Sequence, residues 1–256
     1  MISYRKLAMR VLGHSPVSAV KTARRSTGKR AAALALTAAL VVGMTLPAFA
    51  DTWYIDDGDI SISAGTNGNN VTQNGTTTEN DTNTVIKSDN PSKASSNTVT
   101  IHADEGKTVN VTLDNVNINT SKTGDAAVSV TGKGDTNIEL NGNNTLTSGG
   151  RQAGLEHNKK DSNGKETSGT LTITDTDKNG SLTANGSSGG AGIGGATFKD
   201  AGKLEITGGT INATGSNGGA GIGGGDQGGD ADIVISGGTI TAAGGSDPRP
   251  GAVGGA

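Results

Sequence analysis

The stretch GAGIGG occupies residues 190–195 and recurs, 29 residues later, at residues 219–224. The same offset relates the stretch GGTI at residues 208–211 to its second copy at residues 237–240. A period of this length, kept by several motifs at once, indicates a repeat protein in which each copy stacks on its neighbours.

Alternating apolar and polar residues predict that the repeats are built from short strands. Examples are LTIT at 171–174, VNVTL at 109–113 and IEL at 138–140. Alternation with a period of two residues marks a strand with one buried face. Because the copies keep the same strand order, each strand is expected to lie beside its counterpart in the next copy, about 4.8 Å away along the axis. The predicted fold is all-β, a right-handed parallel β-helix of about five to six coils over residues 97–256.

Weaker copies of the repeat extend in both directions. The stretches AGL at 153–155 and AAV at 126–128 match AGI at 191–193. A polar insert at residues 158–168 interrupts the regular spacing, and GAVGG at 251–255 has the form of a truncated last copy. The central Ile, Leu or Val of each copy is expected to fill a narrow core, and the glycines to let neighbouring coils approach closely.

Composition excludes several other architectures. The 256 residues include 43 Gly, no Cys and 2% aromatic residues, and 31% of them are hydrophobic. So few large apolar side chains exclude a thick globular core and leave a disordered chain or a thin repetitive core, of which the 29-residue spacing of Leu and Ile favours the second. The lack of Cys excludes disulfides, thiolate zinc sites and Cys nucleophiles.

Residues 51–96 are predicted to form a lead-in of cap strands and loops over one end of the solenoid. Trp53 and Tyr54 are adjacent and point to opposite faces of a strand, so one of them is expected to pack on the core. The polar stretch from residue 65 to residue 96 predicts loops, with weak strands around Val71 and around residues 85–86. A cap is expected because the end of a solenoid is otherwise an open sheet edge.

The first 50 residues have the layout of a secretory signal peptide. Basic residues end at Arg30, an apolar run follows at residues 31–44, and Ala48 and Ala50 precede Asp51. A signal peptidase reads small residues at these two positions, so cleavage is predicted between Ala50 and Asp51. The apolar run is short for a membrane span, so the signal helix is expected to be removed and to leave no stable span; an anchor helix is the alternative. We therefore expect a secreted or cell-surface protein of a bacterium.

The charge of the remaining chain is strongly asymmetric. The first 50 residues contain eight basic residues and no acidic ones. Residues 51–256 therefore carry 13 basic and 24 acidic residues, a formal charge of −11. This balance repels polyanions at long range and attracts cations. Nucleic acid is therefore not an expected partner.

Three segments together resemble a known family. They are WYIDDGDISIS at 53–63, GGAGIGGA at 189–196 and GGAGIGGGDQGGDADIVISGGTI at 218–240. These segments resemble secreted bacterial proteins that contain a carbohydrate-binding domain and form β-helices with GAGIGGG repeats. The resemblance covers residues 52–245 and implies an exported or surface-associated β-helix that binds polysaccharide, with calcium as a candidate ion.

Acidic clusters supply the candidate calcium ligands. Asp175, Asp177 and Asn179 have the spacing of oxygen ligands at positions 1, 3 and 5 of a loop, with Gly180 making the turn. Position 12 of that loop is Gly186 rather than an acid, so the segment is not an EF-hand. An ordinary Asx-rich turn explains the same residues without a metal.

Two further clusters have a weaker pattern. Asp226, Asp230 and Asp232 form one imperfect copy of a calcium-binding nonapeptide, whose sites need neighbouring copies to share ligands. The last cluster, Asp56, Asp57 and Asp59, has the composition of a solvated turn. Calcium is therefore a candidate ligand, and no cofactor is required.

No pattern of catalytic residues is present in the sequence. His102 and His157 have no partner at ligand spacing, and both are expected at the surface. Arg151, in a turn beside the insert, is the candidate base or substrate clamp of a lyase-like enzyme. The glycine runs lack the Lys-Ser/Thr pair that a phosphate loop requires. The chain is predicted not to be an enzyme.

These observations predict an exported binding or adhesion scaffold that recognises extracellular polysaccharide. Because aromatic residues are scarce, recognition is expected through rows of Asn, Thr and Asp repeated on successive rungs. A structural stalk of a larger surface protein is the first alternative. A polysaccharide lyase-like enzyme is the second.

Overall fold

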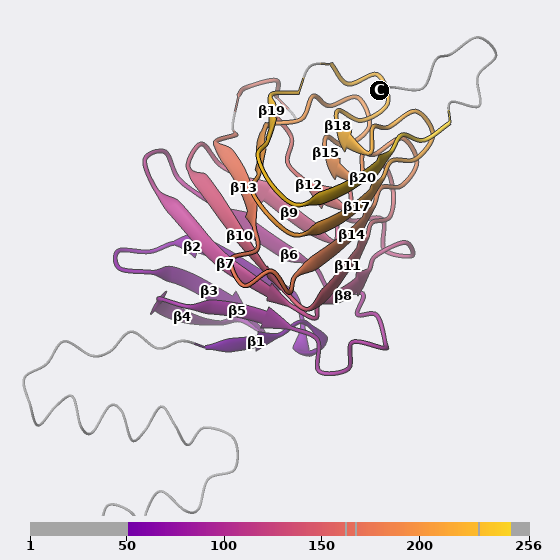
Figure 1. Ribbon diagram of the computed structural model, residues 1–256. Helices are drawn as coiled ribbons and strands as arrows, with labels where there is room; N and C mark the ends of the chain where they lie inside the picture. Colours follow the sequence, from indigo (N-terminus) through magenta and orange to yellow (C-terminus); the bar gives the residue numbers. More distant parts are fainter. Residues whose placement is uncertain (1–50, 162, 167, 230, 247–256) are drawn as a thin grey trace, which may run out of the picture. The chain divides into compact units, whose positions relative to one another are not determined.

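The computed structural model describes residues 51–161, 163–166, 168–229 and 231–246, which form three β-sheets around one narrow core (Figure 1). The predicted signal peptide, with Ala48 and Ala50, and the GAVGG stretch at 251–255 lie outside the described residues. Within the described ranges the chain has no α-helix, and accordingly no helix long and apolar enough to cross a membrane.

Sheet A contains seven parallel strands, because one strand from each winding joins it. Its inward residues are the alternating Val, Leu and Ile residues of the predicted strands. In order across the sheet the strands are β1 (Thr52–Tyr54), β5 (Thr84–Lys87), β7 (Thr108–Asp114), β10 (Asp135–Asn141), β13 (Thr170–Thr174), β16 (Lys203–Ile206) and β19 (Ile233–Ile235).

Sheet B contains eight strands, of which six are parallel and two belong to a hairpin at one edge. In order across the sheet they are β18 (Ile222–Gly223), β15 (Ile193–Gly194), β12 (Leu155–Glu156), β9 (Val128–Thr131), β6 (Val99–His102), β2 (Ile60–Ala64), β3 (Asn69–Gln73) and β4 (Thr76–Asp81). The antiparallel strands β3 and β4 make the hairpin and extend the sheet beyond β2.

Sheet C contains five parallel strands and completes the five windings that begin with β6, β9, β12, β15 and β18. They are β20 (Thr239–Ala243), β17 (Thr210–Thr214), β14 (Ser181–Asn185), β11 (Asn143–Thr147) and β8 (Asn117–Asn119). The chain passes through sheets B, A and C in that order, so that β6, β7 and β8 form one winding and β9, β10 and β11 the next.

The register confirms the predicted parallel β-helix. Ile193 pairs with Ile222, and Leu155 pairs with both Ile193 and Val128, as the repeat alignment predicts. The strands that contain Leu204 and Ile233 pair in the same 29-residue register. Side chains of like kind therefore form columns inside the solenoid, where most of them are fully buried.

The solenoid has about seven windings, more than the five to six predicted. The difference arises in the lead-in. There β1, β2 and β5 pair in parallel with later strands and are themselves part of the solenoid. The weak strands predicted around Val71 and residues 85–86 are present as β3 and β5, whereas the rest of the polar stretch was predicted as loops and contains β4.

The two ends of the solenoid differ. At the N-terminal end Trp53 packs on the core, as predicted for one of the two adjacent aromatics, and the short 3-10 turn η2 (Ile55–Asp57) buries Ile55. At the end formed by β18, β19 and β20, Ile235 is 50% exposed although it continues the inner column of the buried Ile206. The last described winding therefore leaves its inner face partly uncovered.

Candidate functional site

A continuous row of hydroxyl groups crosses the outer face of sheet B. Alternate residues of a strand point to opposite faces, and the residues on either side of Ser61 and of Thr100 are buried in the core. The strand register places Ser61 beside both Thr72 and Thr100. We call this row the hydroxyl strip; its members, from β4 to β9, are Thr77, Thr72, Ser61, Thr100 and Ser129.

One cavity lies at the middle of the hydroxyl strip, where Thr72, Ser61 and Thr100 line it. It has a volume of about 500 Å³ and is lined by Asp59, Ile60, Ser61, Thr72, Asn74, Gly75, Thr98 and Thr100. Asp59 is engaged in this region, because its Oδ1 accepts hydrogen bonds from the backbone N–H and the hydroxyl of Thr98 at 2.7 and 3.1 Å. The cavity therefore offers hydroxyl and amide groups together with the exposed carboxylate of Asp59, of which Oδ1 is engaged by Thr98.

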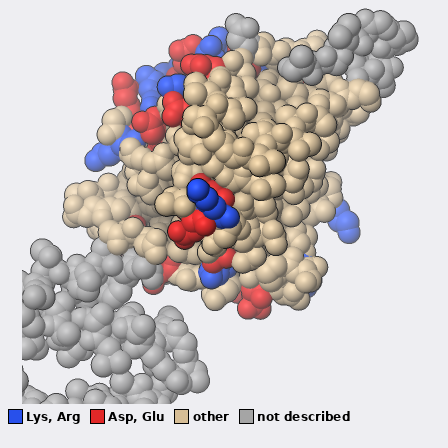
Figure 2. Space-filling model, viewed as in Figure 1, with Lys and Arg blue, Asp and Glu red and all other residues tan. Residues whose placement is uncertain are grey.

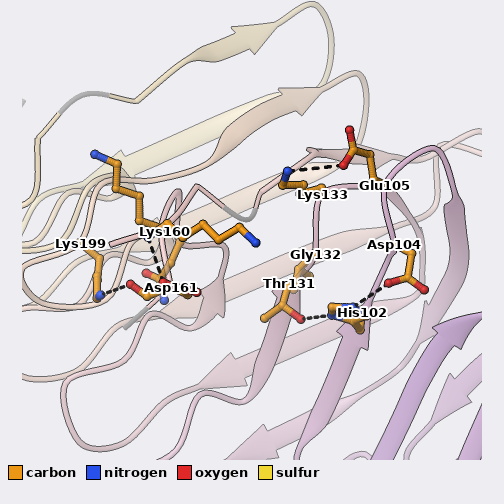
Figure 3. A pocket seen from close by; sticks show the side chains of 12 residues that line it. His102, Asp104, Glu105, Thr131, Gly132, Lys133, Lys160, Asp161 and Lys199 are labelled. Carbon is orange, nitrogen blue, oxygen red and sulfur yellow. Dashed lines mark hydrogen bonds and ion pairs between the residues drawn. The ribbon is translucent and has the colours of Figure 1, made fainter. Parts of the chain in front are cut away.

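A larger cavity lies at the corner where the chain leaves sheet B for sheet A (Figure 3). Its volume is about 660 Å³, and four successive windings contribute to it through the connections that follow β6, β9, β12 and β15. We call it the lysine pocket; it is lined by His102, Asp104, Glu105, Val130, Thr131, Gly132, Lys133, Asn158, Lys160, Asp161, Lys165 and Lys199.

Ion pairs and hydrogen bonds hold one wall of the lysine pocket (Figure 3). The His102 ring lies between Thr131 and Asp104, with Nδ1 3.0 Å from Thr131 Oγ1 and Nε2 3.3 Å from Asp104 Oδ1. Lys133 Nζ lies 3.4 Å from a carboxylate oxygen of Glu105. His102 and Thr131 occupy neighbouring positions of one outward column, so the pocket begins next to the hydroxyl strip.

The polar insert at 158–168 forms the opposite wall. The carboxylate of Asp161 accepts hydrogen bonds from the backbone N–H groups of Asn163 and Lys165 at 2.8 and 3.0 Å, which closes a tight turn. Lys199 Nζ donates to the carbonyl oxygen of Asp161 at 2.9 Å and ties the insert to the next winding. In the part of the chain that the structure describes, neither Lys160 nor Lys165 forms an ion pair.

A buried acid lies directly behind the insert. Glu156 is 9% exposed, its Oε1 accepts a hydrogen bond from Asn158 Nδ2 at 2.9 Å, and its Oε2 is buried without a hydrogen-bond partner. Burial raises the pKa of Glu156 from 4.5 to about 7, against the opposing effects of hydrogen bonds and the charge of Lys199. Close to neutral pH this group therefore exists in both protonation states.

The prediction that His157 lies at the surface was wrong. The side chain is 1% exposed, with Nδ1 3.3 Å from the carbonyl oxygen of Val130 and Nε2 3.1 Å from that of Gly169. Burial lowers the pKa of His157, an effect larger than that of the carbonyl groups that raise it. Val130 and Gly169 come from other parts of the chain, so local sequence gives no sign of this burial. His102, by contrast, has a half-exposed side chain at 51%.

Polar rows of the predicted kind also occur on sheets A and C, where several members hydrogen-bond to one another. On sheet A, Asn137 Nδ2 donates to Asn110 Oδ1 at 2.8 Å beside a cavity of about 420 Å³, and the hydroxyl of Thr174 donates to Glu139. On sheet C, Ser181 Oγ donates to Asn143 at 2.9 Å. These rows use part of their hydrogen-bonding capacity within the solenoid, as does the hydroxyl strip where the Thr72 and Thr77 hydroxyl oxygens lie 2.7 Å apart.

The three acidic clusters of the sequence do not converge. Asp175, Asp177 and Asn179 lie in the connection between β13 and β14, where Asp175 Oδ1 accepts the backbone N–H groups of Asn179 and Gly180, both at 3.1 Å. The Asp175 carboxylate therefore closes this loop on backbone N–H groups four and five residues further along the chain. Among the residues with described positions, no group of three or more His, Cys, Asp or Glu residues is placed to hold a metal.

The other two clusters lie at separate places. Asp226 and Asp232 belong to the connection between β18 and β19, and Asp230 lies outside the described residues. Asp56 Oδ2 accepts the backbone N–H of Asp89 at 2.6 Å at the N-terminal end of the solenoid, near Asp57 and Asp59. Calcium binding by any of these residues stays a prediction.

Arg151 does not line the lysine pocket. Its guanidinium lies 5.7 Å from the centre of the Phe198 ring, a cation–π distance, and its carbonyl oxygen accepts hydrogen bonds from the backbone and side chain of Thr197. These contacts fasten neighbouring windings to each other.

The sequence did not identify the hydroxyl strip or the lysine pocket. The signal for the strip was present in the alternation of Ser and Thr with Ile and Val, but β4, which completes it, was predicted as loop. The signal for the pocket was the lysine content of the only long insert in the repeats. Comparison with protein-family models, curated proteins and solved structures gave no match.

Proposed function

We propose that this chain is an exported scaffold that binds an extracellular polysaccharide across the outer face of sheet B. Export rests on the basic, apolar and small-residue layout of the first 50 residues. Binding rests on one observation: the hydroxyl strip lines a cavity of about 500 Å³ on the outer face of sheet B and lies next to His102 and Thr131, where the lysine pocket of about 660 Å³ begins.

The hydroxyl strip suits a polymer of sugars. Its five members lie on five adjacent strands, so that successive hydroxyls are about 4.8 Å apart. Each hydroxyl both donates and accepts, as sugar hydroxyls do. A single such bond contributes only about 0.5–1.5 kcal/mol, so useful affinity requires several contacts along one chain.

The lysine pocket suits an acidic substituent on that polymer. A carboxylate or sulfate group would pair with Lys160 and Lys165, which have no ion-pair partner among the described residues. The formal charge of −11 on residues 51–256 opposes an acidic ligand at long range. At physiological salt, however, charges more than about 8 Å away are largely screened, so that the nearest lysines dominate.

A panel of neutral, uronate-containing and sulfated polysaccharides, tested against the purified processed protein, examines the proposal. We expect binding to acidic polymers that weakens as salt is raised. Lys160→Ala with Lys165→Ala should weaken it about 10- to 100-fold, through the loss of charge-assisted contacts. The matched control is Lys93→Ala with Lys122→Ala, a pair of exposed lysines outside the pocket, which should have no effect.

The strip is tested by a second pair of variants. Combined substitution of Ser61, Thr100 and Ser129 by Ala should reduce affinity about tenfold. Combined substitution of Thr145, Thr183 and Thr241 by Ala, which removes outward hydroxyls of sheet C, should leave affinity unchanged. Equal losses in the two variants would contradict binding on sheet B.

The same assay separates the alternatives. Loss of binding in EDTA would assign a role to calcium, whereas unchanged binding would confine recognition to the side chains. Absence of binding to every polysaccharide would favour a structural stalk. Appearance of new reducing ends during incubation would favour a lyase or hydrolase.

A further inference from the structure

The carboxylate of Asp81 is buried beside Asp51, the first residue after the predicted cleavage point. Asp81, at the end of β4, is 1% exposed. The backbone N–H of Asp51 donates to Asp81 Oδ1 at 3.4 Å, and the indole N–H of Trp53 donates to Asp81 Oδ2 at 3.0 Å. Asn83 donates its backbone N–H to Oδ1 at 3.1 Å. Asp81 therefore holds the first strand of the solenoid against the turn that precedes β5.

No neighbouring Lys or Arg of the described chain neutralises the negative charge of the Asp81 carboxylate. Burial, and to a lesser extent the charge of Asp81, raise the pKa of the Asp51 carboxyl. Lys87 of β5 is paired with Asp114 at 2.6 Å, and no Lys or Arg of the described chain forms an ion pair with Asp81. A buried carboxylate with only N–H donors would gain stability from a positive charge at the position of the Asp51 nitrogen.

We propose that cleavage of the Ala50–Asp51 bond creates an α-ammonium group that pairs with Asp81 and fastens β1 and Trp53 over the N-terminal end of the solenoid. The small residues Ala48 and Ala50 define the cleavage point, and the structure places the nitrogen that cleavage would release beside Asp81. Cleavage then completes the N-terminal cap of the solenoid and also removes the signal peptide.

The covalent step is an ordinary hydrolysis. A signal peptidase adds one water molecule across the amide bond, so that the carbonyl carbon of Ala50 gains the hydroxyl and becomes a carboxylate. The nitrogen of Asp51 keeps its proton, takes up two more and becomes an ammonium. Asp81 can accept this group because a carboxylate has about four lone-pair sites, of which three are engaged. The existing 3.4 Å contact becomes a charge-assisted one.

The proposal rests on export and is independent of polysaccharide binding. To test it, the full chain is expressed in an exporting bacterial host beside a variant with one extra Ala between Ala50 and Asp51. The extra residue moves the ammonium one position away from Asp81 and leaves the remaining chain unchanged. Intact mass of the processed proteins identifies the first residue of each.

Two readouts follow processing. The α-amine of the protein that begins at Asp51 should react with an acylating reagent at pH 8 about tenfold more slowly than that of the insertion variant, because the ion pair holds it protonated. Its thermal midpoint, followed by the fluorescence of Trp53, the only tryptophan of the chain, should be about 2–4 °C higher at pH 7. The difference should vanish at pH 10, where the amine is neutral.

Asp81→Asn provides the control. In that background the insertion should change neither the acylation rate nor the thermal midpoint, which separates ion pairing from simple crowding of the amine. A processed chain that begins elsewhere than at Asp51, or equal rates and midpoints with and without the inserted Ala, would overturn the proposal. Neither result depends on whether the protein binds a polysaccharide.

Discussion

Glu156 shows how a repeat position can acquire a chemical property that its counterparts lack. Its neighbours in the same outward column of sheet B are Ser129 and Gly194, which cannot ionise. The acid is buried behind the insert with one oxygen unpartnered, and its folded-state pKa of about 7 lies above its ordinary 4.5. The folded state therefore favours the protonated form. The stability that this form contributes is complete below pH 4.5 and is lost as the pH rises through 7.

Glu156→Gln should remove this pH dependence, because Gln stays neutral. The difference in pKa corresponds to roughly 3 kcal/mol. The free energy of unfolding, measured with urea, should be higher for the variant than for the unsubstituted protein at pH 8. At pH 5 this difference between the two proteins should be smaller, by roughly 3 kcal/mol. Glu79→Gln, at an exposed position of β4, is the control and should show no such difference. Parallel pH curves for Glu156→Gln and the unsubstituted protein would contradict the account of this residue.

Single residues were the least predictable part of the structure. Sequence alone placed His157 at the surface, because nothing near it in the chain indicates burial. Its partners Val130 and Gly169 come from other parts of the repeat and enclose it only when the windings stack. Burial of an isolated polar residue depends on what folds over it, and an insert with no counterpart in other copies cannot be aligned.

Among the elements, the glycine-rich connections between sheets C and B explain how neighbouring windings pack so closely. A Cβ atom added to Gly190 would lie 2.0 Å from the carbonyl oxygen of Gln152 in the previous winding. Real Cβ contacts are never this short, and the opposing atom is backbone, which cannot rotate away. Glycine is therefore required in the GAGIGG motif because the backbones of neighbouring windings lie too close for a Cβ atom, and not because the chain must be flexible.

Gly190→Ala should destabilise the protein by more than 2 kcal/mol, since either β15 or the preceding winding must shift. Gly106→Ala is the matched substitution. Gly106 has a φ of +75° but nothing within 4 Å of an added Cβ, so its cost should be limited to backbone strain of about 1 kcal/mol. Thermal unfolding of the two variants measures the difference. Equal midpoints would show that the solenoid tolerates wider spacing than the structure indicates.

The hairpin of β3 and β4 was predictable from a signal that the repeat analysis did not use. Asn74 and Gly75 join the two strands and have φ values of 52° and 73°, as a type I′ turn requires. An Asn-Gly pair between alternating strands is a strong sign of a two-residue hairpin. The regular strands were predicted correctly because 29-residue spacing and alternation agree. Of the hairpin only β3 was predicted, as a weak strand around Val71; β4 was predicted as loop because it belongs to no repeat and is wholly polar.

For the whole molecule, stability should depend on position along the solenoid axis, because each winding is covered by the next. Ile206 and Ile235 occupy the same column, yet Ile206 is fully buried and Ile235 is 50% exposed at the open end. Ile206→Ala should therefore cost about 2–5 kcal/mol and Ile235→Ala about 1 kcal/mol or less. Urea denaturation of both variants measures the two losses of unfolding free energy. Equal costs would indicate that a further layer covers the end in solution.

Recognition of an acidic polysaccharide across sheet B is the central claim, and lysine footprinting tests it most directly. The processed protein is acylated with and without an oligomer of uronic acids, and the modification of each lysine is followed by mass spectrometry. The oligomer should slow acylation of Lys160, Lys165 and Lys199 several-fold and leave Lys93 and Lys122 unchanged. Uniform rates at all five lysines, or protection only of the latter two, would contradict it.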